Sequence, residues 1–245
     1  MARVGIGVLA LACLSCAACG AATERADADE CADYEPQAPR EWLAASPREF
    51  KEAELLAMEA SEYVVADPAT YEQIAADLTA IYAKEVAVKG WPVYITHMDV
   101  DSVGVHLDAT GRQQLNSGTY RAWNCPNAAY GVEVNADASG SLALHFGPKR
   151  LNRAQLVNEY RKLPHVVGGL DFPFYTFDGS DICREVVGET RYYVFDRATG
   201  DCTFTCMEHR YIGFALNGTT LELHRDTDAD WHDWFKARSD CASRL

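Results

Sequence analysis

The sequence predicts an α+β fold, in which N-terminal helices are followed by mainly antiparallel strands in hairpins, stabilised by disulfides. Apolar residues recur at helical spacing up to residue 90, and beyond it the apolar period shifts toward two. Six cysteines follow an export signal, so disulfides are expected. At 245 residues the chain is also long enough to bury a sizeable core.

The first twenty residues have the features of an export signal. Met1-Ala2-Arg3 gives a positive start, residues 4–14 are uncharged and mostly apolar, and small residues lead to Cys19-Gly20. The apolar run is shorter than the roughly 20 residues that a membrane-spanning helix needs. We therefore expect no transmembrane helix in the mature protein.

Cys16-Ala17-Ala18-Cys19-Gly20 resembles the lipobox of bacterial lipoproteins. The resemblance implies that Cys19 is diacylated, becomes the mature N-terminus and holds the protein on a membrane surface of the cell envelope. The family prefers Leu where this chain has Cys16, so Cys13 or Cys16 could compete for the lipid. The alternative is a plain secretory signal cleaved near residues 20–22.

Three segments follow from this N-terminus: a signal peptide at 1–18, a flexible acidic tether at 19–45, and one α+β domain at 46–245 with a possible sub-boundary near 150. Between residues 20 and 41 seven acidic residues face only two arginines, and large apolar residues are almost absent. Such a segment cannot bury enough apolar surface to offset the entropy of ordering it.

Two helices are expected before residue 90. Ser46-Pro47-Arg48-Glu49 is a capping box with proline at the first helical position, which predicts a helix to about residue 62. Asp67-Pro68 predicts a second helix that ends at Gly90. One face of this second helix should be buried, through Tyr71, Ile74, Leu78, Ile81 and Tyr82.

A first set of strands is expected at 93–96, 103–107, 129–134 and 141–146, with hairpin turns at 108–111 and 137–140. Asn152 should cap a helix over residues 153–163.

A second set of strands is expected at 172–177, 182–187, 191–195, 210–216 and 219–224, with turns at 197–200 and at Asn217-Gly218. Acidic residues at 226–230 precede a last helix, which holds Trp231, Trp234 and Phe235.

The cysteines outside the signal are expected in disulfides, because exported proteins fold in an oxidising compartment. They are Cys31, Cys125, Cys183, Cys202, Cys206 and Cys241. Six cysteines allow 15 pairings, of which we favour Cys202 with Cys206 and Cys31 with Cys241. Zinc binding by Cys202, Cys206 and His209 would need reduced thiols and a fourth ligand, so we expect His209 to face solvent or a carboxylate.

Charge excludes several classes of protein. The chain has 22 Lys and Arg against 36 Asp and Glu, a formal net charge of −14. Nucleic acid is not an expected partner, because phosphate binding needs clustered cations. Nor should the protein adhere to anionic lipid by charge, so membrane contact is expected through the lipid anchor only.

The sequence favours a non-catalytic binding module, because no standard catalytic or nucleotide-binding motif is present and no cofactor or metal is implied. Its partner, an unknown protein or small ligand, is expected at an aromatic segment next to a glycine pair. That segment holds Phe172, Phe174, Tyr175 and Phe177. A strand buried on both faces is the alternative for it, although Pro173 favours an edge or a bulge.

An envelope hydrolase with a divalent metal or carboxylate site is the alternative function, because seven histidines occur in an acidic chain. Its candidate residues are His97, Asp99, Asp101, His209, His224 and Asp226. Residues 226, 228 and 230 have the spacing of a calcium loop, but Trp231 and Ala237 stand where that loop needs Gly and Glu. Helix capping is the simpler role for these acidic residues.

Overall fold

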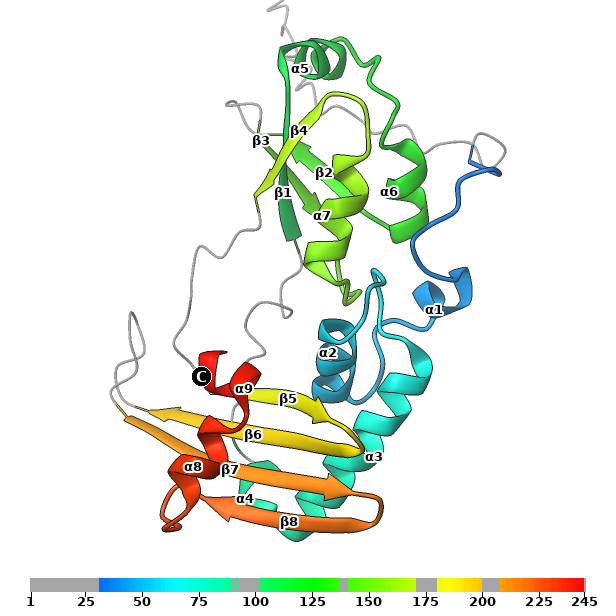
Figure 1. Ribbon diagram of the computed structural model, residues 1–245. Coiled ribbons are helices and arrows are strands. Elements are labelled where there is room, and N and C mark those ends of the chain that lie inside the picture. The colour runs from blue at the N-terminus through cyan, green and yellow to red at the C-terminus, as the bar shows by residue number, and fades with distance from the viewer. Residues whose placement is uncertain are drawn as a thin grey trace, which may run out of the picture.

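The computed structural model describes residues 31–89, 91, 102–136, 141–170, 180–199 and 208–244. These residues form two antiparallel four-stranded sheets, each covered by its own helices (Figure 1). The predicted α+β class is therefore confirmed. We call the half around the first sheet the upper lobe and the half around the second sheet the lower lobe, as they lie in Figure 1.

The upper sheet contains β1 (Ser102–Leu107), β2 (Glu133–Ala136), β3 (Ser141–His145) and β4 (Val166–Leu170), in the order β2-β3-β1-β4. Helices α5 (Ala109–Asn116) and α6 (Asn124–Tyr130) connect β1 to β2, and α7 (Arg153–Arg161) connects β3 to β4. This is the double split β-α-β connectivity of ferredoxin-like folds. The topology alone indicates no function.

The expected turn at 108–111 is instead the start of α5. The Asp108 side chain caps this helix by accepting a hydrogen bond of 2.7 Å from the backbone N–H of Gly111. Gly111 is buried, and a Cβ there would lie 2.7 Å from the Cβ of His165. The strand expected at 129–134 begins only at Glu133, because α6 continues to Tyr130. Asn152 caps α7 as predicted.

The lower sheet is a meander of β5 (Asp181–Val187), β6 (Thr190–Thr199), β7 (Glu208–Asn217) and β8 (Thr220–Arg225). The turn predicted at Asn217-Gly218 is confirmed, with Gly218 at φ +56°. The turn predicted at 197–200 is wrong for its first three residues, which continue β6 and pair with residues 208–210 of β7.

The N-terminal helices are α1 (Arg40–Ala44), α2 (Lys51–Glu59), α3 (Pro68–Lys84) and α4 (Val86–Lys89). α3 begins at Asp67 as predicted, where the carboxylate accepts from the N–H of Thr70. The capping box at Ser46 is wrong, because α2 starts only at Lys51 without a side-chain cap. The Ser46 hydroxyl bonds the backbone of Arg150 instead.

Two cores hold the lobes, and the chain passes between them more than once. Leu43, Val64 and Val65 belong to the core of the upper lobe, whereas the buried residues of α2 and α3 belong to that of the lower lobe. In the lower lobe α2 and α3 cover one face of the sheet. The opposite face carries α8 (Trp231–Lys236) and α9 (Ser239–Arg244) (Figure 1).

Two disulfides are present among the described residues. Cys31 pairs with Cys125 at the start of α6, and Cys183 of β5 pairs with Cys241 of α9. The favoured pairing of Cys31 with Cys241 is therefore wrong, because the two residues belong to different lobes. Cys202 and Cys206 lie outside the described residues. Disulfides of this kind are typical of exported proteins. No helix in the described ranges is long and apolar enough to cross a membrane.

The expected tether is partly folded. Residues 31–45 pack on the upper lobe, where Ala38 is 4% and Leu43 is 3% exposed. The backbone N–H of Gln37 donates to the hydroxyl of Tyr130 at 2.8 Å. The disulfide at Cys31 and these contacts order a segment that composition alone marks as flexible. Residues 19–30 lie outside the described residues.

Candidate binding site

The structure brings three of the predicted site residues onto one face. His209, His224 and Asp226 all lie at the α8 side of the lower sheet. The aromatic segment with Phe172, Phe174, Tyr175 and Phe177 lies outside the described residues. The same holds for His97, Asp99, Asp101 and Cys19.

Strand register explains why these residues share a face. Side chains alternate along a strand, so His209, Tyr211 and Gly213 of β7 point to the same side of the sheet. His224 pairs directly with Gly213 across β7 and β8 and therefore joins them. On this side the sheet meets α8, whose rings at positions 231, 234 and 235 project toward β7.

Six aromatic side chains form a continuous series of nearly parallel rings, which we call the ring stack. His209 lies 6.0 Å from Tyr211 at 15°, and Tyr211 lies 5.5 Å from Phe235 at 29°. Phe235 lies 5.4 Å from Trp231 at 9°. The series continues from Trp231 to Trp234 at 5.3 Å and 24°, and ends with His224 at 4.5 Å and 23° from Trp234.

The ring stack is only partly covered by protein. Trp231 is 8% exposed and forms its buried centre, together with the Cys183–Cys241 disulfide and Val194. The other five rings are half-buried. Large apolar rings gain most when they are fully buried, so five half-buried rings side by side leave apolar surface that a ligand can cover.

Carboxylates lie at both ends of the ring stack. Nδ1 of His209 lies 2.7 Å from the buried carboxylate of Asp196, which confirms the expectation of a neighbouring carboxylate. At the other end, Nε2 of His224 lies 3.9 Å from exposed Glu222. Beside the middle of the stack, the Asp226 carboxylate accepts a 3.2 Å hydrogen bond from the backbone N–H of Tyr211.

A guanidinium already lies on these rings. The Arg238 guanidinium carbon is 3.7 Å above the ring of Tyr192 and 5.4 Å from that of Trp234. Such contacts are attractive because the face of an aromatic ring is electron-rich. The segment that carries Arg238 is held to the sheet by the disulfide at Cys241 and by Glu185, whose carboxylate accepts from the N–H groups of Asp240 and Cys241.

The acidic residues before α8 are used for backbone contacts other than the expected helix caps. Asp228 accepts from the N–H of Arg225 at 2.7 Å, and Asp226 accepts from Tyr211. Asp230 holds the N-cap position of α8, but its side chain makes no capping hydrogen bond. Within the described part of the chain, no group of three or more His, Cys, Asp or Glu side chains gathers as metal ligands would.

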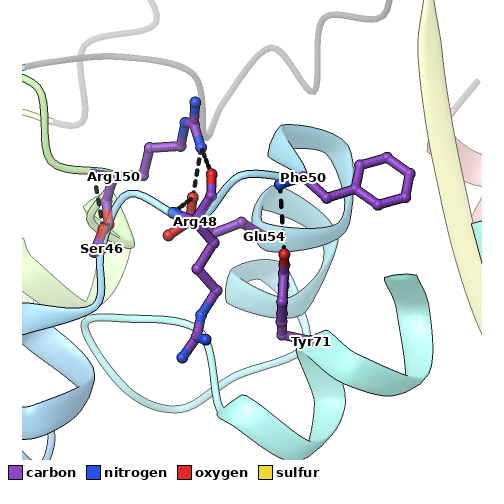
Figure 2. Close-up of polar contacts among 6 residues, drawn as sticks. All are labelled: Ser46, Arg48, Phe50, Glu54, Tyr71 and Arg150. Atoms are coloured by element: carbon purple, nitrogen blue, oxygen red, sulfur yellow. Dashed lines mark hydrogen bonds and ion pairs between the residues drawn. The ribbon is translucent and has the colours of Figure 1, made fainter. Parts of the chain in front are cut away.

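A second polar cluster, which we call the clasp, joins the two lobes (Figure 2). Glu54 of α2 is 1% exposed, and its carboxylate accepts from Nη1 of Arg150 at 2.6 Å and from the N–H of Arg48 at 2.9 Å. Arg150 also donates to the carbonyl of Arg48 and, through its backbone N–H, to the hydroxyl of Ser46. The clasp satisfies its charges with its own residues, so its role is structural.

Sequence reasoning identified the rings of α8 but missed Tyr211, Gly213, Tyr192 and Arg238. Their importance depends on which strand lies under α8, and that is set by long-range pairing. The available signal was the spacing of Trp231, Trp234 and Phe235, which places the three rings on one side of a helix.

The chain was compared with protein-family models, with curated proteins and with solved structures, and none of them matches. The functional argument below therefore depends on the sequence and the geometry of this chain.

Proposed function

We propose that this protein is exported, is anchored by a lipid at Cys19 to a membrane of the bacterial cell envelope, and acts there as a non-catalytic binding module. Its ligand contacts the ring stack and combines a cationic group with a flat or apolar part.

Export and anchoring are supported by the sequence of the N-terminus and by cysteine chemistry. The first twenty residues have the order of regions of a secretory signal, and Cys16 to Gly20 resemble a lipobox. Two disulfides among the described residues agree with folding in an oxidising compartment.

The binding role depends on one observation, the series of five half-buried rings around Trp231. Covering exposed apolar surface contributes about 25 cal/mol per Å². A ligand that lies over several of these rings gains that energy without any rearrangement of the sheet. Aromatic side chains are also enriched where proteins bind partners.

A cationic ligand is favoured by the charges around the rings. Glu222, Asp226 and Asp228 lie next to them, and the chain as a whole has a net charge of −14. Arg238 demonstrates that rings of this cluster accept a guanidinium. Contacts between cations and rings contribute roughly 0.5–2 kcal/mol, so a small probe should bind weakly and a larger ligand more tightly.

The test uses two small probes of the same shape and different charge. L-argininamide and L-citrullinamide are titrated into residues 20–245, and saturation-transfer difference NMR records the signals of the probe. We expect transfer to argininamide at millimolar concentration and several-fold less transfer to citrullinamide. Equal transfer to both probes would exclude the cationic class, and no transfer to either would contradict the binding site.

Matched tryptophan variants locate the site. Trp234→Leu removes a ring of the stack and should abolish the transfer to argininamide. Trp91→Leu removes a partly buried ring that packs on the opposite face of the lower sheet, and should leave the transfer unchanged. Both variants are first checked for a cooperative thermal transition, so that loss of binding is separated from loss of folding.

Anchoring is tested in a bacterial host that lipidates exported proteins. The intact mass of wild type from the membrane fraction should include the diacylglyceryl group, and Cys19→Ser should leave the membrane fraction. Lipid-free wild type in the soluble fraction would contradict the anchor and leave the binding role to be judged by the probes.

A further inference from the structure

The Cys31–Cys125 disulfide determines where the link to the lipid anchor leaves the folded protein. Cys31 is held at the start of α6, in the upper lobe (Figure 1). The following residues are fixed as well, because Tyr34 donates to Glu159 of α7 and Gln37 donates to Tyr130. Only the residues between positions 19 and 31 can act as a free link.

This link is short compared with the protein. Its fully extended reach is about 40 Å at 3.3–3.6 Å per residue. If it behaves as a flexible coil, its root-mean-square length is roughly 20 Å. A compact chain as long as residues 31–244 has a radius of gyration of about 17 Å, and the two-lobed arrangement in Figure 1 is longer than a sphere of that size. The end of the molecule near Cys31 must therefore stay close to the membrane.

The surface at this end has features that suit lipid headgroups. A shallow cavity of about 490 Å³ lies along residues 32–40 and is closed on one side by Tyr63. Tyr63 is 42% exposed and packs edge-on against Trp42 at 5.3 Å. Tyr and Trp favour the interface between membrane and water, and the exposed Arg40 beside them can pair with a phosphate. We call residues 32–40 with Trp42 and Tyr63 the root surface.

We infer that the root surface faces the phospholipid bilayer, while the ring stack in the lower lobe points away from it. This inference depends on the lipid anchor proposed above. The occupant of the shallow cavity is then the headgroup layer of the membrane that holds the anchor. The ligand of the ring stack must reach the protein from the aqueous side.

Quenching by labelled lipid tests this orientation. The lipidated full mature chain is placed in phosphatidylcholine vesicles that carry a spin label on the headgroup. A fluorescent amino acid replaces either Tyr63, in the root surface, or the exposed Lys236, in α8. We expect several-fold stronger quenching at position 63 than at position 236. Equal quenching, or stronger quenching at 236, would overturn the inference.

Two further measurements separate the inference from the anchor. The same labelled chains without lipid should show no quenching at either position, because a chain with net charge −14 has no electrostatic attraction to this surface. Intact mass verifies the lipid on each sample. A lipidated chain that shows no quenching at position 63 would overturn the inference alone. Absence of the lipid from material made in the host would contradict the proposed function instead.

Discussion

Trp234 lies against the backbone of Gly213, so closely that a Cβ at position 213 would overlap its ring and would stand 3.0 Å from Trp231. The ring stack therefore requires a residue without a side chain in the middle of β7. Gly213 is also the residue opposite His224, the last ring of the series. One glycine thus permits the close approach of α8 and the sheet on which the candidate binding site is built.

Gly213→Ala should lower the free energy of unfolding by about 1–3 kcal/mol, because overpacking forces the two tryptophans away from the strand. Binding of argininamide should weaken with it. Urea denaturation followed by circular dichroism measures the change. Gly168→Ala in β4 is the matched control, since its Cβ would meet only the edge of His106 at 4.0 Å. Similar losses in both variants would show that the contact with Trp234 is not the cause.

Glu54→Ala should destabilise the protein by about 1–3 kcal/mol, because it leaves Arg150 and the N–H of Arg48 without their shared carboxylate. Arg150 is 23% exposed, which places the expected loss below that of a fully buried pair. Glu49→Ala is the control: Glu49 is the second residue of the predicted capping box but is exposed in the structure. Thermal denaturation of both variants compares them, and a larger loss for Glu49→Ala would favour the capping box.

Asp108 should make stability depend on pH in the acid range. The N–H of Gly111 and the ring of His165 hold the pKa of this carboxyl below its ordinary value of 3.8. A lowered pKa stabilises the folded state above pH 3.8, and this contribution is lost as the pH falls below it. Wild type should thus lose stability below about pH 4 more steeply than Asp108→Asn, as measured by urea denaturation at several pH values. Parallel curves would contradict this.

Removing the Cys183–Cys241 disulfide by the double change to Ala should lower the free energy of unfolding by about 4 kcal/mol, as the chain-entropy estimate gives for a separation of 58 residues. It should also weaken the near-ultraviolet circular dichroism of the tryptophans, because α9 is then held to β5 by Glu185 alone among the contacts described above. The double change of Cys31 and Cys125 is the comparison: it should destabilise similarly and leave argininamide binding intact.

Elements with a local signal could be predicted from the sequence. Asp67 and Asn152 cap α3 and α7, and Asn217-Gly218 turns β7 into β8, because each of these contacts involves residues that are neighbours in the chain. The same local signals were wrong at Ser46 and Asp108. The partner of Ser46 is Arg150, more than one hundred residues away, and Asp108 caps a helix that packs under His165.

The candidate site could be predicted only in part, for the same reason. The last helix and its three rings follow from sequence spacing. Tyr211, Gly213 and His224 join them through strand pairing, and Cys183 joins Cys241 only once α9 lies on β5. No spacing in the sequence specifies those contacts between distant elements.

The five tryptophan indoles provide the most direct test of the ligand site. In a proton–nitrogen correlation spectrum of residues 20–245, each indole N–H gives its own signal. Addition of L-argininamide should shift the signals of Trp231 and Trp234 and leave those of Trp42, Trp91 and Trp123 in place. L-citrullinamide should shift none of the five. Shifts spread evenly over all five tryptophans, or no shift at Trp231 and Trp234, would contradict the ring stack as the binding site.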